Sequence, residues 1–147
     1  MGQEAGESVE VESQLDALHD RIETALRDSL DEQWAEVLGQ WDGASDRQRE
    51  AVRASVSDLR DRVLDSLSSI ESREEIERGL AVGYVEMKCH WTMLNTQIQH
   101  QTAHNGRPDE ELIYRATCVS LIVQALEPLL TRERVENLTG LLAEPLE

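Results

Sequence analysis

The chain has 147 residues, and its 30 Asp and Glu against 14 Lys and Arg give a formal net charge of −16. This length suits a single domain that buries a hydrophobic core of its own. The apolar residues are mostly Leu, Val, Ile and Ala, with no Phe, which is typical of helical bundles. Composition and charge together argue against wholesale disorder, a disulfide scaffold and a basic nucleic-acid-binding protein.

The basic residues are strongly biased towards arginine, because Lys88 is the only lysine in the chain. An acidic composition with Arg in place of Lys resembles that of proteins from salt-loving archaea, in which a dense carboxylate surface keeps the protein soluble in molar salt. A merely acidic protein from an ordinary source is the alternative. In either case the chain is a poor partner for DNA, whose phosphates would repel it.

Nothing in the sequence indicates export or insertion into a membrane. Residues 1–14 hold four glutamates and no apolar run, unlike a secretory signal. No stretch is expected to come near the roughly 20 apolar residues of a spanning helix. Cys89 and Cys118 fit no CxxC spacing, so we predict reduced, buried thiols. A cytoplasmic location, or the virion for a viral component, follows from these features.

The first long helix is predicted over residues 9–42. Its apolar residues recur every three or four positions, as one face of a helix requires. They include Leu15, Leu18, Ile22, Leu26, Leu30, Trp34, Leu38 and Trp41. Gly43 ends this helix, and Ser45 with Gln48 has the spacing of a capping box. A second helix is therefore predicted over 46–70.

A third long helix is predicted over residues 73–104. Ser72 with Glu75 repeats the capping-box spacing at its start, and Gly106 follows its end. Its apolar residues alternate steps of four and three, like the seam of a coiled coil. They are Ile76, Leu80, Tyr84, Met87, Trp91, Leu94 and Ile98.

Two shorter helices are predicted to follow, over 108–127 and 132–143. The first of them has no charge from residue 116 to residue 126 and is apolar almost all round. Such a helix is buried in a core or in an interface. Pro128 breaks the pattern, and Thr131 can cap the last helix.

These elements predict an all-α fold. Helices of more than thirty residues joined by short links favour antiparallel neighbours. We therefore expect an elongated antiparallel helical bundle, with long coiled-coil-like helices and a shorter C-terminal pair. Residues 1–8 are predicted to be a flexible acidic N-terminus, and 9–147 a single helical domain.

One segment departs from the rest of the chain. Residues 89–106 carry no formal charge, in a sequence of which 30% is charged, and they are rich in Gln, Asn, Thr and His. A stripe along one side of the third helix brings polar and apolar residues together at steps of three and four. The residues we predict at an interface are Glu86, His90, Met93, Gln97, His100, Gln101 and His104. A face of this kind looks like one that is meant to be covered.

Three interpretations of this segment remain open. The first is a surface covered within the bundle or between subunits, where polar groups set register. The second is a metal site for zinc or another divalent transition metal, because His100 and His104 have the i, i+4 spacing that lets two rings face one ion, with His90 as a further ligand. The third is a small-molecule pocket lined by His90, Trp91 and Tyr84.

The remaining polar clusters are interpreted as solvated surface. The second helix has the most basic stretch, but its arginines are interleaved with carboxylates at salt-bridge spacings. They are Arg47, Arg49, Arg53, Arg60 and Arg62. No catalytic residue is predicted, since no nucleophile has a base at a defensible spacing.

The expected function is therefore that of a non-enzymatic interaction or assembly protein: a scaffold, an adaptor or a small structural component, such as one of a virion. It would self-associate or bind a protein partner through residues 89–106, without cofactor, nucleic acid or membrane. The alternative is a metal- or ligand-binding regulatory bundle centred on His90, His100 and His104.

Overall fold

The computed structural model describes residues 14–130, and these residues are all-α with no strand. The first helix covers residues 14–39 and contains a π-helical stretch. The elements are η1 (Thr24–Asp28), α2 (Ser29–Gly39), α3 (Asp46–Ser68), α4 (Arg73–Asn105), α5 (Glu110–Leu126) and the 3-10 turn η2 (Glu127–Leu129). The predicted flexible N-terminus (1–8) and the predicted helix 132–143 lie outside the described residues.

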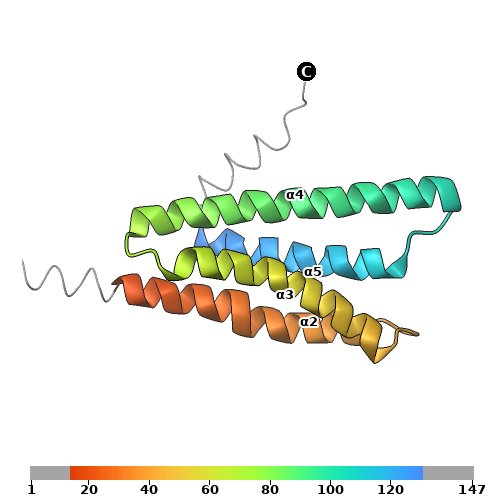
Figure 1. Cartoon of the computed structure of the whole chain (residues 1–147), viewed down its shortest axis with the longest axis horizontal. Helices are drawn as coiled ribbons and strands as arrows, with labels where there is room; N and C mark the ends of the chain where they lie inside the picture. Colours follow the sequence, from red (N-terminus) through yellow and green to blue (C-terminus); the bar gives the residue numbers. More distant parts are fainter. Residues whose placement is uncertain (1–13, 131–147) are drawn as a thin grey trace, which may run out of the picture.

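The helices lie side by side along the longest axis of the molecule (Figure 1). The first helix and α4 lie on opposite sides, with α3 and α5 between them. α5 contacts the first helix, α3 and α4. Its uncharged stretch supplies the buried residues Ala116, Cys118, Val119, Ile122, Val123 and Leu126. This stretch is therefore core.

The α5 region also has the length and composition of a membrane span. Glu110–Leu129 covers 20 residues, contains an 18-residue window with a mean hydropathy of 1.3, and is the one such segment within residues 14–130. This differs from the expectation that no stretch would come near that length. In the fold, the buried residues of this segment belong to the core shared with the other helices.

Two of the four predicted helix ends are confirmed, at Ser45 and at Gly106, whereas the first helix ends at Gly39 and not directly before Gly43. Gln48 N–H donates to Ser45 Oγ (3.1 Å), and Ser45 N–H donates to Gln48 Oε1 (2.8 Å), so this capping box is confirmed. Gly106 ends α4 at φ +73°, a left-handed conformation that glycine adopts without strain. Asp109 caps α5 by accepting from the Glu111 N–H. The capping box predicted at Ser72 is wrong, because its side chain makes no capping hydrogen bond.

The π-helical stretch explains an irregularity in the first helix. From Leu18 to Leu38 the core residues come in five successive steps of four. In a regular α-helix each such step turns about 40° too far, so the stripe would drift by about 200°. The wider π turn, closed by i→i+5 hydrogen bonds, rotates less per residue, so it accommodates one extra residue and takes up about 100° of this drift. Leu26, inside this stretch, and Leu30, just after it, are consequently both fully buried.

Two glycines of α4 lie directly against side chains of α3. A Cβ atom at Gly83 would lie 3.1 Å from Val63 Cγ1, and one at Gly79 would lie 2.6 Å from Leu67 Cδ2. The missing side chains therefore allow α3 to pack against the backbone of α4. Neither glycine was singled out by the sequence patterns above.

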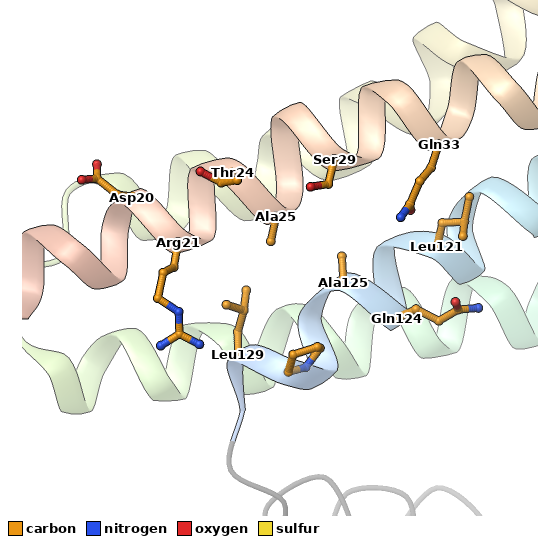
Figure 2. Close-up of a pocket in the computed structure, with 11 residues that line it drawn as sticks. Asp20, Arg21, Thr24, Ala25, Ser29, Gln33, Leu121, Gln124, Ala125 and Leu129 are labelled. Carbon is orange, nitrogen blue, oxygen red and sulfur yellow. The ribbon is translucent and has the colours of Figure 1, made fainter.

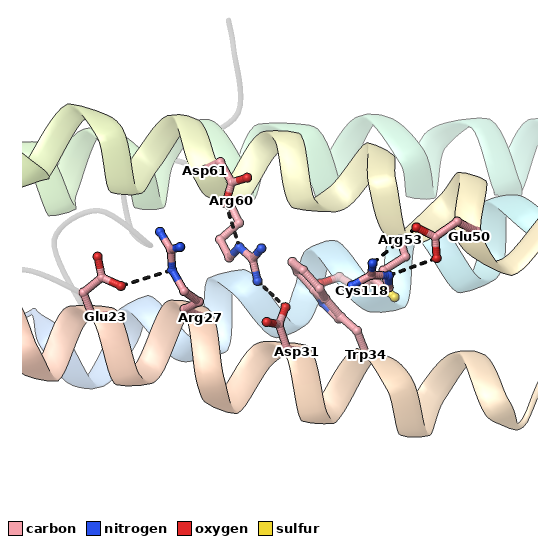
Figure 3. A network of polar contacts seen from close by, with 9 residues as sticks. All are labelled: Glu23, Arg27, Asp31, Trp34, Glu50, Arg53, Arg60, Asp61 and Cys118. Carbon is pink, nitrogen blue, oxygen red and sulfur yellow. Dashed lines mark hydrogen bonds and ion pairs between the residues drawn. The ribbon is translucent and has the colours of Figure 1, made fainter.

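Arg60 is a buried charge at the centre of a polar network (Figure 3). Its side chain donates to Asp31 and to Asp61 (3.1 Å), and its guanidinium lies 4.9 Å from the centroid of the Trp34 ring. Trp34 in turn donates from Nε1 to the backbone oxygen of Cys118 (3.1 Å). The network thereby connects α2, α3 and α5.

The prediction that the arginines of α3 form a solvated face is therefore wrong for two of them. Arg60 is only 7% exposed. Arg49 donates to the backbone oxygens of Leu38 (3.0 Å) and Trp41 (2.7 Å), where α2 ends. A cation that satisfies the last carbonyls of a helix also complements its dipole. Arg53 does form a surface pair with Glu50, whose hydrogen bond raises the pKa of Arg53.

Candidate interaction surface on α4

The two halves of α4 have different surroundings. In its N-terminal half, Ile76, Leu80, Tyr84 and Met87 are buried in the core. After Met87 no residue of α4 is fully buried. The C-terminal end also extends past the ends of the other helices (Figure 1). Most of the uncharged segment is thus left with a free outer side.

That outer side carries a regular second seam, which we call the outer seam. Its members alternate steps of four and three over three heptads, and all of them are exposed. They are Val82, Glu86, Cys89, Met93, Thr96, His100 and Ala103. Met93 is 60% exposed and Val82 is 58% exposed. Large apolar side chains that are exposed on the same helix face are the informative case, in contrast to single exposed apolar residues. Glu86 is the single charged member.

The outer seam is less polar than its amino-acid sequence suggests. The hydroxyl of Thr96 donates to the backbone oxygen of Thr92 (2.9 Å), and that of Thr92 donates to the backbone oxygen of Lys88 (2.9 Å). Hydroxyls engaged within the helix in this way no longer need water or a partner. The threonines can therefore present their methyl groups to whatever covers this side.

The structure separates the residues predicted at the interface into three groups. Glu86, Met93 and His100 belong to the outer seam, and Gln97 and His104 are exposed beside it. His90 is half-buried. Gln101 is also half-buried, and its Oε1 accepts from the Asp109 N–H (2.7 Å), so this side chain holds the loop between α4 and α5.

Four members of the outer seam were missed from sequence: Val82, Cys89, Thr96 and Ala103. The signal that could have found them is their spacing of seven residues, which becomes visible once α4 is examined for two seams. The prediction that both thiols are buried is also wrong for Cys89, which is exposed. Cys118 is buried, and burial raises the pKa of its thiol to about 12.

The histidines do not converge on one point. The rings of His100 and His104 lie edge to face, with centroids 4.3 Å apart. His90 is ten residues before His100, which is about 15 Å along a helix. Within residues 14–130, no group of three or more His, Cys, Asp or Glu side chains could hold a metal ion. A zinc site needs three or four protein ligands, so this pair alone is incomplete.

The residues of the predicted small-molecule pocket are not brought together either. Tyr84 is buried, and its hydroxyl donates to Glu127 Oε1 (3.3 Å). His90 lines a depression of about 310 Å³ between α3 and α4, together with Arg62 and Cys89. Trp91 and Tyr84 are not part of its lining.

A larger groove, of about 610 Å³, lies beside the π-helical stretch, between the first helix and α5. Ala25 and Ala125 face each other across it, and Leu129 closes the end at which Arg21 lies (Figure 2). Asp20 is the one carboxylate of its lining. The groove can accommodate apolar side chains.

Comparison with family models, with curated proteins and with solved structures finds no match for this chain. What the outer seam can bind is therefore inferred from its own residues. It offers an exposed and largely apolar helix face with one charged residue, about 32 Å long from Val82 to Ala103 at 1.5 Å per residue. Such a face is suited to contact with another helix.

Proposed function

We propose that this chain is a non-enzymatic assembly protein, which self-associates or binds a protein partner through the outer seam of α4. The observation that carries the proposal is the combination of exposure and neutrality on this seam. Met93 and Val82 are more than half exposed, and one carboxylate interrupts three heptads. In a chain with 30 acidic residues, a solvated face of this length would be expected to carry several.

Electrostatics favours this face over the rest of the surface. Two copies with a charge of −16 each repel one another, and like charges brought together in an interface are costly. The uncharged half of α4 lets another chain approach without placing carboxylate against carboxylate. If the acidic composition reflects a cell rich in salt, a Debye length of about 3 Å at 1 M further weakens the long-range repulsion.

The wider proposal follows the sequence interpretation. The helices would form an elongated antiparallel bundle of the coiled-coil type, supported by the alternating steps of four and three on both seams of α4. The chain would act as a scaffold, an adaptor or a small structural component, in a halophile's cytoplasm or in a virion. It would need no cofactor, nucleic acid or membrane.

The test is the absolute molar mass in solution, by light scattering after size exclusion in molar KCl. We expect a defined oligomer that dissociates in Gln97→Glu and His100→Glu, because each variant adds a carboxylate to the shared face. Ala54→Glu, on the exposed and charged side of α3, is the matched control and should leave the mass unchanged. Circular dichroism should show similar helix content in all four proteins. A monomeric wild type, or an oligomer that survives both substitutions, would overturn the proposal.

The metal-binding alternative has one observation in its favour, the contact between the rings of His100 and His104. Elemental analysis of protein purified without a histidine tag distinguishes it. Stoichiometric zinc or another transition metal that disappears in His100→Ala would favour a metal-dependent regulator. Absence of metal from fully associated protein would exclude this alternative.

A further inference from the structure

We infer that the occupant of the outer seam is a second copy of this chain, whose α4 packs antiparallel to the first about a two-fold axis near Leu94 and Asn95. This inference rests on the proposed function and makes it specific. It names the partner, its direction and the residues that meet. Three properties of the seam support it: register, charge and size.

The register follows from the heptad spacing. One set of seam positions (Val82, Cys89, Thr96, Ala103) and the other (Glu86, Met93, His100) repeat every seven residues. In an antiparallel pair, a position of the first set faces a position of the second set. Two arrangements each bring six of the seven seam positions into contact. The one that overlaps more of the uncharged segment, residues 89–100 of each copy, places Cys89 opposite His100 of the second copy, Met93 opposite Thr96 of the second copy, and Glu86 opposite Ala103 of the second copy. The other, centred near Trp91, places Cys89 opposite Met93 of the second copy and overlaps only residues 89–93. Each contact then occurs twice, as a two-fold interface requires.

The charge distribution selects the antiparallel direction. In a parallel pair, the one carboxylate of the seam would face itself, Glu86 against Glu86, and so would His100. In the antiparallel pair, Glu86 reaches the turn of the second copy that carries His100 and His104, two groups that can donate hydrogen bonds to it.

The charges in the N-terminal third of α4 also favour the antiparallel direction. Glu74, Glu75 and Glu77 lie in its first turns. A parallel pair would set these carboxylates beside their counterparts. In the antiparallel pair they lie beyond the end of the other α4, at opposite ends of the dimer, and the two uncharged halves meet each other.

The size of the seam predicts a reversible association. A helix face about 32 Å long and about 10–12 Å wide offers a few hundred Å² per copy. This is below the roughly 800 Å² per partner of a standard stable interface. We therefore expect a dimer whose mass depends on protein concentration, rather than a permanent complex.

The native thiol supplies the test. Cys89 is exposed, and the other cysteine, Cys118, is fully buried. In the antiparallel pair the two copies of Cys89 are offset by eleven residues, about 16 Å along the axis, which is too far for a disulfide. In a parallel pair they would face each other directly.

The experiment is mild oxidation at a concentration where light scattering shows association, followed by non-reducing electrophoresis. Wild type should stay uncrosslinked, and His100→Cys should form a covalent dimer through Cys89. Thr102→Cys is the matched control: it is exposed at nearly the same height on α4 but lies off the seam, so it should not crosslink. If removing His100 weakens association, Cys89→Ser with Met93→Cys and Thr96→Cys tests the neighbouring layer in the same way.

The outcomes separate this inference from the function on which it rests. A covalent dimer of wild type through Cys89 would overturn the antiparallel direction and leave assembly through the seam intact. A crosslink in Met93→Cys, through the native Cys89, but not in His100→Cys would overturn this register and leave the seam as the contact between copies. An oligomer that crosslinks in none of these variants would overturn the seam itself. A monomer at every concentration would overturn self-association itself.

Discussion

Replacing Arg60 separates the contribution of its charge from that of its packing. The guanidinium is buried, but its two carboxylate partners are not: the side chains of Asp31 and Asp61 are 45% and 48% exposed. When the cation is removed, these carboxylates can be rehydrated. The heavy penalty of an orphaned buried charge, about 3–5 kcal/mol, should therefore not arise.

The cost of Arg60→Ala can be worked out from its contacts (Figure 3). The stacked contact with Trp34 contributes about 1 kcal/mol, and each half-exposed ion pair about 0.5 kcal/mol. The two buried methylenes beyond Cβ contribute about 0.8 kcal/mol each, with a further term for the cavity. We expect a loss of about 3–4 kcal/mol.

Arg60→Met keeps the aliphatic stem and places a sulfur near the indole ring, a favourable contact in its own right. We expect it to cost about 1 kcal/mol. The assay is urea unfolding followed by circular dichroism at 222 nm, with the free energy of unfolding extrapolated to water. If Met and Ala destabilise by the same amount, the charge and not the packing is what stabilises this junction, and the reasoning is refuted.

Four further predictions concern glycines, thiols and salt. Gly39→Ala should stabilise the fold by about 0.5–1 kcal/mol, since a Cβ there meets nothing within 4 Å. Gly43→Ala should destabilise the fold by about 1 kcal/mol, because the φ of Gly43 is +84°. The melting temperatures of the two variants must therefore shift in opposite directions. A thiol reagent at pH 8 should label Cys89 quickly and Cys118 only as fast as the protein unfolds, and two fast thiols would contradict the burial described here. Because burial raises the folded pKa of Cys118 from 9.0 to about 12, the contribution of this neutral thiol to the free energy of unfolding is complete below about pH 9 and is lost as the pH rises towards 12. By pH 10.5 the wild type should lose up to about 2 kcal/mol more than Cys118→Ala. Equal losses in the two proteins would contradict this prediction. Molar KCl should raise the urea midpoint of this strongly acidic chain, and a midpoint that falls with salt would remove the argument for a halophilic source.

Periodicity was sufficient for the fold class and for most of the core. Leu26, Leu30, Trp34 and Leu80 were all placed on apolar stripes, and all are fully buried. Arg60 could not be found in this way, because its burial depends on an indole ring and a carboxylate supplied by another helix. Propensity alone marks such an arginine as solvent-exposed.

The candidate surface was only partly visible in the sequence for a related reason. The absence of charge in residues 89–106 pointed to the half of α4 that has no fully buried residue. Which side of the helix faces outward is set by α3 and α5, and the sequence stripe through His90 and Gln97 was therefore displaced from the outer seam by part of a turn. Gln101 shows the same limit: its role depends on where the loop places the Asp109 N–H.

The π-helical stretch also marks where the first helix carries one residue more than a regular α-helix needs. Deleting one exposed residue there, such as Arg27, would let the helix run on as a regular α-helix, with better local hydrogen bonding. Because the π turn already offsets the rotation of about one residue, or about 100°, Leu18 and Ile22 would keep facing the core. A deletion in the regular turns between Glu32 and Val37 has no such turn to absorb it, and would rotate Leu18 and Ile22 away from the core by about 100°. We therefore expect a single-residue deletion to be tolerated within the π-helical stretch and to be destructive beyond it.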